Sequence, residues 1–155
     1  MKKNWFEGSG LIACSIHRLK NALEDHGKFY EGVTRNMSGI TGGKLLEQGA
    51  SHLRIETNEG IMNRTGIKKE FKSEVISIAF DEEYKAGKII NVRSHFLHEF
   101  TVNGAGVKHH ITISDVRASG VLGFFYRIFA RNNIGKILLG AHKRYLEDLK
   151  DGEIR

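Results

Sequence analysis

Alternating apolar and polar residues mark two adjacent segments in the second half of the chain. Over 89–102 the even positions carry apolar side chains, namely Ile90, Val92, Phe96, Phe100 and Val102. Over 107–116 a second apolar face is formed by Val107, Ile111 and Ile113. A period of two is typical of a half-buried strand, and the intervening Asn-Gly pair is a strong hairpin-turn signal. The pattern therefore predicts an antiparallel hairpin with one apolar face.

The turn between these two strands leaves two registers open. A two-residue turn pairs Val102 with Ala105, whereas a four-residue loop pairs Val102 with Val107. Because the side-chain period is two, both registers place the two apolar faces on the same side of the sheet.

The N-terminal pattern predicts a strand over 4–14 followed by a helix. Ser15 is suited to cap that helix, because a serine hydroxyl accepts a hydrogen bond from a free backbone N–H. One apolar face is formed by Ile16, Leu19, Ala22 and Leu23. We expect Gly27 to end this helix and residues 28–31 to add a short second helical turn.

Short strands are predicted between 37 and 117, and a long helix after them. The strands include 53–57, 61–68 and 71–80, the last closed by a charged turn over 81–87. After Gly120 the apolar spacing changes to three and four, which indicates a helix. We expect this helix over about 131–150, with an apolar face formed by Ile134, Ile137, Leu138, Ala141, Tyr145 and Leu149.

Composition indicates a single globular domain over 1–155. The 155 residues are 40% hydrophobic and 27% charged, and the one cysteine, Cys14, allows no intrachain disulfide. No apolar run approaches the roughly 18 residues of a membrane span, and the start of the chain lacks the apolar segment of a signal peptide. These features lead us to expect a cytoplasmic location.

The net charge of +6 raises the question of nucleic-acid binding. The 24 Lys and Arg residues are spread along the whole chain, with no run of five or more and no aromatic motif of the RNA-binding type. Scattered basic residues usually form solvated faces, so we expect no nucleic-acid partner.

The order of one strand, two short helices, six strands and a long helix resembles the START-like superfamily. The likeness lies above all in VRSHFLHEFTVNGAGVKHHITISDV (92–116) and GVLGFFYRIFARNNIGKILLGAHKRYLEDL (120–149), which resemble the bacterial polyketide cyclase/dehydrase-type branch known as SRPBCC. The chain departs from relatives in having no proline. The resemblance implies an α+β helix-grip fold, in which a curved antiparallel sheet of about seven strands surrounds a long C-terminal helix and an internal apolar cavity.

Polar side chains within the apolar stripes are the first candidates for a ligand site. Ser94 and His98 lie on the apolar face of the first hairpin strand, and His109 and Asp115 on that of the second. Burying such groups without partners costs a few kcal/mol each. They therefore either orient a ligand, with acid–base work as a further option, or pair with one another. The cavity residues expected from the fold are Ser94, Phe96, His98, Phe100, His109, Ile111, Ile113, Phe125 and Leu138.

The sequence gives weaker evidence for a metal site, a phosphate-binding loop, a reactive cysteine or a membrane contact. The histidines show no metal-binding spacing such as H-x-x-x-H, and the adjacent His109 and His110 point to opposite faces of a strand, so we expect no metal and no cofactor. The glycine-rich segment 39–43 lacks a following Gly-Lys-Ser/Thr, and Cys14 is interpreted as a small core residue. The aromatic cluster Phe124, Phe125 and Phe129 is core, cavity wall or, beside Arg127 and Arg131, a transient membrane contact.

Three functions remain open at this point. The first is binding or carriage of a hydrophobic or amphipathic small molecule, such as a lipid, sterol or polyketide. The second is a cyclase, dehydratase or hydrolase acting in the same cavity, which needs convergent polar groups with shifted pKa values. The third is a protein-interaction module with a vestigial cavity. The chain is expected to be a monomer or a homodimer.

Overall fold

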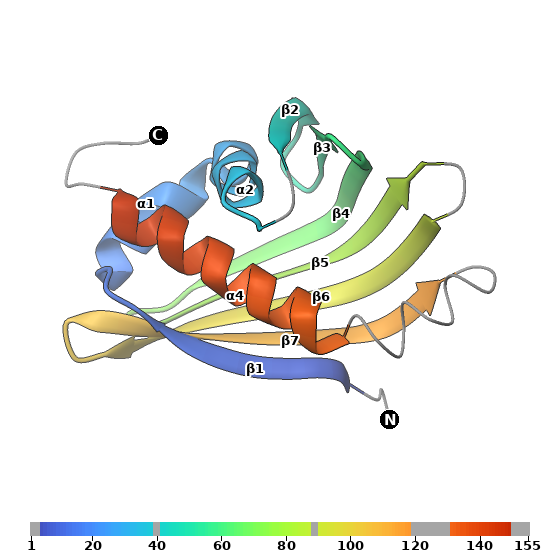
Figure 1. Cartoon of the computed structure of the whole chain (residues 1–155). Helices are drawn as coiled ribbons and strands as arrows, with labels where there is room; N and C mark the ends of the chain where they lie inside the picture. Colours follow the sequence, from blue (N-terminus) through green and yellow to red (C-terminus); the bar gives the residue numbers. More distant parts are fainter. Residues whose placement is uncertain (1–3, 39–40, 88–89, 119–130, 150–155) are drawn as a thin grey trace.

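The computed structural model describes residues 4–38, 41–87, 90–118 and 131–149 (Figure 1). The strands and helices follow one another as β1 (Asn4–Ile12), α1 (Ile16–Glu24), α2 (His26–Arg35), β2 (Gly42–Gln48), β3 (Leu53–Thr57), β4 (Gly60–Phe71), β5 (Val75–Ala86), β6 (Ile90–Asn103), β7 (Gly106–Ala118) and α4 (Arg131–Asp148).

The seven strands form one antiparallel sheet in the order β1-β7-β6-β5-β4-β3-β2. The sheet is curved, and α4 crosses its concave face while α2 lies beside β2 (Figure 1). This arrangement confirms the predicted helix-grip architecture, including the two short helices after the first strand and the long C-terminal helix. None of the helices in the described part of the chain is long and apolar enough to cross a bilayer.

The β6–β7 hairpin adopts the second of the two predicted registers. Val102 pairs with Val107, so Phe100 pairs with His109 and His98 with Ile111. Phe100 and Ile111 are fully buried, whereas Arg93 and Lys108 are exposed on the outer face. The predicted apolar and polar faces of this hairpin are confirmed at these positions, whereas Val102 at its end is 37% exposed.

The prediction that Asp115 lies on the apolar face of the second hairpin strand is wrong. The register of β6 and β7 shifts between Arg93 and His95, and Asp115 has a backbone φ of +54°. A bulge changes which side chains face inward from that point on. Ser114 is therefore buried at 5% exposure and Asp115 is exposed.

Several other element boundaries differ from the prediction, and the strand predicted over 71–80 begins only at Val75, as β5. Ser15 caps α1 as expected, accepting a hydrogen bond from the Arg18 backbone N–H at 3.1 Å. Gly27 does not end the helix. It is the second residue of the ten-residue α2, which Asp25 caps by accepting from the Lys28 backbone N–H. A Cβ on Gly27 would lie 2.2 Å from Gln48 Oε1, so any larger residue there would displace the Gln48 amide.

The charged segment 81–87 is also not a turn. β5 continues to Ala86, and Asp81 to Ala86 are paired with β4 and β6 on both sides. The continued alternation places Asp81 on the outer face, and brings Glu82 and Tyr84 to the wall of the pocket between sheet and helix. This extension supplies polar groups to the concave face that the sequence pattern did not predict.

The core fills the space between the sheet and α4. Its α4 members include Leu138, Ala141, Tyr145 and Leu146, which pack on strand residues such as Phe100. The predicted helix over 131–150 is thus confirmed. The aromatic cluster Phe124, Phe125 and Phe129, which was predicted to be core, cavity wall or a membrane contact, lies outside the described residues.

Candidate functional site

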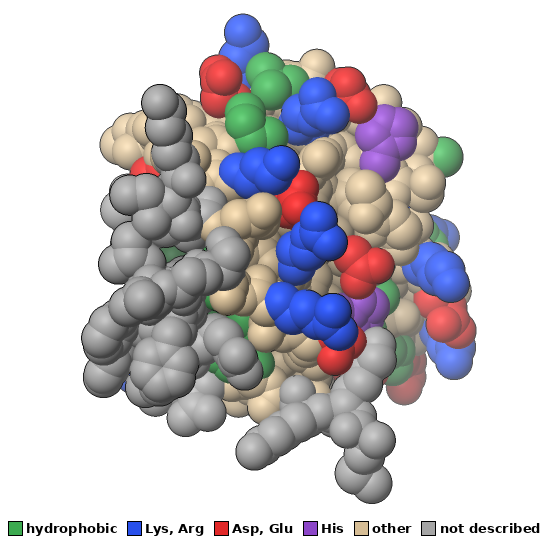
Figure 2. All heavy atoms as spheres, turned by 90° about the vertical axis from the view of Figure 1, so that its right-hand side faces the viewer, with side chains coloured by type: hydrophobic (Ala, Val, Ile, Leu, Met, Phe, Trp, Pro, Cys, Tyr) green, Lys and Arg blue, Asp and Glu red, His purple; other side chains and the backbone are tan. Residues whose placement is uncertain are grey.

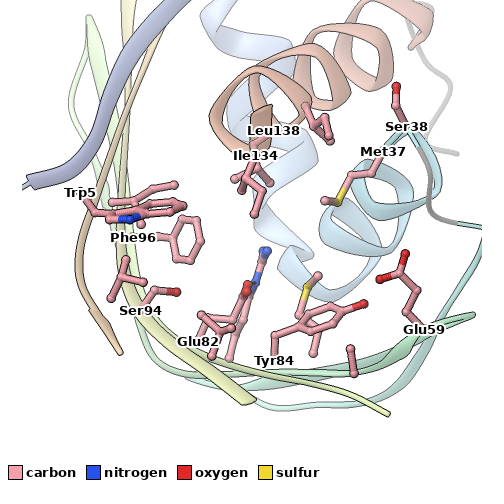
Figure 3. Close-up of a pocket in the computed structure, with 17 residues that line it drawn as sticks. Trp5, Met37, Ser38, Glu59, Glu82, Tyr84, Ser94, Phe96, Ile134 and Leu138 are labelled. Carbon is pink, nitrogen blue, oxygen red and sulfur yellow. Dashed lines mark hydrogen bonds and ion pairs between the residues drawn. The ribbon is translucent and has the colours of Figure 1, made fainter. Parts of the chain in front are cut away.

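A cavity of about 260 Å³ lies between the concave face of the sheet and the first half of α4 (Figure 3). Trp5, Ser94 and Phe96 lie on one side of it, Met37 and Glu59 on the other (Figure 3). Glu82 and Tyr84 rise from the sheet below, and Ile134 and Leu138 come from α4 above. The remaining lining residues are Ser38, Met62, Arg64, Ala86, Val92, Ile113, Val116 and Ile137. The lining is mainly apolar, as expected for a small-molecule pocket.

Four of the nine predicted cavity residues line this cavity: Ser94, Phe96, Ile113 and Leu138. Phe100 and Ile111 are fully buried in the closed part of the core. His98 and His109 are also buried there, at 1% and 0% exposure, and do not line the cavity. Phe125 lies outside the described residues.

A buried ion pair lies in the cavity wall. Arg64 on β4 and Glu82 on β5 are direct cross-strand partners, and Arg64 Nε donates to Glu82 Oε2 at 2.9 Å. Their side chains are 3% and 10% exposed. A charge buried to this extent is retained only when it is paired, because desolvation costs several kcal/mol per ion.

Aromatic rings hold the Arg64 guanidinium in place. Its Cζ lies 4.4 Å from the ring centroids of both Tyr30 and Phe80, and 5.9 Å from that of Phe96. The Arg64 Nη1 atom is buried and has no hydrogen-bond partner among the described residues. A buried N–H without a partner costs free energy, so a ligand atom that accepted a bond from Nη1 would be favoured.

Tyr84 adds a second polar group to the lining. Its hydroxyl lies 3.0 Å from Thr57 Oγ1, and burial raises the pKa of the Tyr84 hydroxyl above its usual range. This hydroxyl therefore stays protonated at neutral pH. Sequence reasoning missed Arg64, Glu82 and Tyr84, although all three continue the period-two pattern of their strands.

Comparison with known proteins gives structural matches only. No protein-family model and no curated protein matches the chain. An uncharacterised protein from Rhizobium leguminosarum superposes with a TM-score of 0.66 at 13% identity, over 96% of this chain and 97% of that one. The lipid transfer and protein localization domain of human StarD13 superposes with a TM-score of 0.55 at 8% identity, over 92% of this chain and 77% of that one. The di-domain ARO/CYC protein BexL superposes with a TM-score of 0.53 at 15% identity, over 94% of this chain and 50% of that one.

The chain has the START-like, helix-grip fold. The neighbours include a lipid transfer domain and an ARO/CYC protein. In this START-like chain the helix grip leaves the cavity at one end of α4 and a closed core at the other.

The closed end of the START-like core holds three histidines. His98 Nδ1 and His109 Nε2 are 2.9 Å apart, which confirms that the two residues are neighbours across the hairpin. The third, His142, comes from α4, and its ring centroid lies 4.9 Å from that of His98 and 4.7 Å from that of His109. Burial lowers the pKa of all three imidazoles, that of His142 to about 4, so they are neutral at pH 7.

The outer surface of the fold carries paired charges. On β5 and β6, Arg93 Nε donates to Glu83 Oε2 at 2.8 Å, and His95 Nδ1 lies 2.9 Å from Asp81 Oδ1. Figure 2 shows Lys and Arg side chains interspersed with Asp and Glu side chains over one end of the molecule. Such mixed charge is typical of a solvated face.

Proposed function

We propose that this protein binds a small apolar or amphipathic molecule in the cavity between the sheet and the first half of α4. The observation that carries the proposal is a mainly apolar cavity of about 260 Å³ whose wall contains a buried arginine with an unpartnered Nη1. An apolar wall with one or two polar anchors is the arrangement expected of a ligand carrier.

Arg64 is the proposed anchor for the polar end of the ligand. Its Nη1 can only donate, so the ligand atom facing it is an acceptor such as a carbonyl, hydroxyl or carboxylate oxygen. Glu82 already balances the Arg64 charge, which favours a neutral acceptor over a second carboxylate. Ser94 is a secondary anchor, and the apolar body of the ligand packs on Phe96, Ile113 and Leu138.

The size of the cavity favours a small ligand. Its volume of about 260 Å³ lies just below the roughly 300–1,000 Å³ of pockets that hold drug-sized molecules. We therefore expect a short-chain or one- to two-ring molecule to bind more tightly than a sterol or a two-chain lipid.

A ligand screen with matched variants tests the proposal. Fatty acids of graded length, sterols and aromatic ketones are compared by thermal shift, since a ligand of the native state raises Tm. Binding is then titrated through the fluorescence of Trp5, the single tryptophan, which lines the cavity. Native mass spectrometry of protein purified from its source identifies any molecule that is carried along.

Two variants separate the cavity from the outer surface. Arg64→Met/Glu82→Leu removes the inner ion pair without leaving one charge unpaired, and we expect it to weaken binding at least tenfold, which is about 1.4 kcal/mol. The control Arg93→Met/Glu83→Leu removes the exposed pair with nearly the same geometry and should leave affinity unchanged. Equal affinity in all three proteins, or no ligand from the screen and none co-purified, would overturn the proposal.

A cyclase-type enzyme is the second candidate, favoured by one observation. The Tyr84 hydroxyl lies in the cavity lining with its proton retained, and a fixed phenol can donate a hydrogen bond that polarises a ligand carbonyl. The same mass-spectrometric experiment separates the two functions. A carrier returns an added ligand unchanged, whereas a dehydratase returns a product that has lost water and a cyclase returns a ring-closed isomer with a different retention time.

A further inference from the structure

Three buried histidines converge behind the cavity without satisfying one another's hydrogen bonds. His98 comes from β6, His109 from β7 and His142 from α4, and each is at most 1% exposed. One nitrogen from each ring lies within 4.8 Å of the other two. Such a concentration of polar atoms in an apolar core is costly unless each atom finds a partner.

The hydrogen bonds account for only part of the six ring nitrogens. His142 Nδ1 donates to the Leu138 carbonyl oxygen at 2.7 Å, which fixes its proton and leaves Nε2 as a lone-pair atom. His142 Nε2 and His109 Nδ1 are both buried without a hydrogen-bond partner in the described structure. His98 Nδ1 and His109 Nε2 share a single proton at most, at 2.9 Å.

From this geometry we infer that His98, His109 and His142 form a binding site for one transition-metal ion, which would tie α4 to the β6–β7 hairpin. Three features support the site. Neutral imidazole is the ligating form. The bond from His142 Nδ1 to a backbone carbonyl is the outer contact that usually orients a ligating histidine. Ligand nitrogens around a tetrahedral ion with bonds of 2.0–2.1 Å lie about 3.3 Å apart; the closest observed pair is 2.9 Å apart and all three nitrogens lie within 4.8 Å of one another.

The surroundings of the cluster restrict the type of ion. Imidazole nitrogens suit Zn²⁺ and copper, and the cluster includes no carboxylate from the part of the chain that the structure describes. The guanidinium of Arg64 lies near enough to His98 and His142 to disfavour further positive charge there. The site therefore favours an ion that adds little positive charge, namely Cu⁺ with a single charge, or Zn²⁺ whose charge is reduced to the same value by an anionic fourth ligand such as hydroxide.

The route to the site runs past the cavity wall. Phe96 lines the cavity and its ring stacks on that of His98 with centroids 6.0 Å apart. Leu138 also lines the cavity, and its carbonyl holds His142. Phe96 and Leu138 therefore join the cavity lining to the histidine cluster, and we propose that a metal ion enters past them.

Metal titration of the purified full chain tests the inference. After treatment with a chelator, the protein is titrated with Zn²⁺, with Co²⁺ as a coloured substitute for Zn²⁺, and with Cu⁺ under reducing conditions. We expect one equivalent of Zn²⁺ or Cu⁺ to bind and to raise Tm. Nitrogen NMR of the histidine rings should show three imidazoles shifting together at one equivalent of metal.

Single substitutions assign the ligands. His98→Leu, His109→Leu and His142→Leu should each weaken the binding by about a hundredfold or more, since even outer-shell changes cost 10–100-fold. His110→Leu is the matched control, because His110 is the next residue on β7 but faces outward, 3.1 Å from Glu7. This variant should bind the metal as the parent does.

The site is refuted by any of three results. The first is parent protein that binds neither Zn²⁺ nor Cu⁺ at one equivalent. The second is metal binding that survives all three core substitutions, which would place it on surface histidines. The third is metal addition that leaves the three buried rings unshifted in NMR, which decides the question even if a Leu variant does not fold.

Discussion

Two Arg–Glu pairs of nearly the same geometry lie on opposite faces of the sheet, and only one of them is buried. Arg64 Nε donates to Glu82 Oε2 at 2.9 Å with both side chains at most 10% exposed. Arg93 Nε donates to Glu83 Oε2 at 2.8 Å with side chains 70% and 26% exposed. Comparing Glu82→Gln with Glu83→Gln therefore isolates the effect of burial on one chemical change.

The losses of unfolding free energy expected for Glu82→Gln and Glu83→Gln differ by several kcal/mol. Glutamine keeps the size of glutamate but removes its charge, so Glu82→Gln leaves the Arg64 guanidinium buried without a counter-charge. Breaking a buried pair in this way costs about 3–5 kcal/mol of unfolding free energy. The rings of Tyr30 and Phe80 offset part of this, since each lies 4.4 Å from the guanidinium. Glu83→Gln should cost about 0–1 kcal/mol, because water screens the outer pair.

Urea unfolding followed by circular dichroism measures both values. The Glu82→Gln protein should unfold at a lower urea concentration with an unchanged slope, and its Tm should fall by roughly 6–20 °C. The Glu83→Gln protein should match the parent within about 1 kcal/mol.

A double substitution completes the test. Arg64→Met/Glu82→Leu removes both charges and should recover most of the stability lost in Glu82→Gln, because apolar groups can replace a buried ion pair at little cost. The reasoning fails if Glu82→Gln and Glu83→Gln are equally mild, or if the double variant is less stable than Glu82→Gln.

Three further outcomes follow from single side chains. Phe100→Ala, at a fully buried position, should cost about 3–5 kcal/mol in urea unfolding; a loss below 1 kcal/mol would show that the core there is not closed. Ser15→Ala should cost about 0.5–2 kcal/mol by the same assay, since Ser15 caps α1. Burial lowers the pKa of His26 below 6.5, so the unfolded chain takes up a proton that the folded one refuses, and stability falls as the pH drops below about 6.5. His26→Gln should lessen this dependence between pH 6.5 and 5 without removing it, because His98, His109 and His142 act in the same direction; an unchanged slope would contradict it.

The parts of the fold that depend on local pattern were predictable from sequence. The alternation in β6 and β7 predicted their inward face, and the change of period predicted α4 to within two residues of its observed end at Asp148. Both patterns can be recognised from sequence alone because each apolar stripe lies within one continuous element. The register of the hairpin was narrowed to two options, and the structure has the second.

The residues that sequence reasoning missed depend on contacts between distant segments. Glu82 follows the buried stripe of Ile78 and Phe80 at the next inward position, but a carboxylate there breaks the apolar pattern and resembles a turn. The buried Glu82 carboxylate is stabilised by its cross-strand partner Arg64, which lies 18 residues earlier in the chain. His142 likewise lies on the buried face of α4 beside Ala141. Its approach to His98 depends on how the helix docks, which periodicity does not encode.

The residue Leu138 marks where α4 passes from the cavity wall to the closed core. Before it, Ile134 and Ile137 face the cavity, and after it Ala141 and Tyr145 are buried in the closed core. Leu138 itself belongs to both regions, since its side chain lines the cavity and its carbonyl holds His142. A side chain against an open cavity loses fewer contacts on truncation than one in a closed core. Substitutions before Leu138 should therefore act mainly on ligand affinity and those after it mainly on stability, so the two properties of this fold can be altered separately along a single helix.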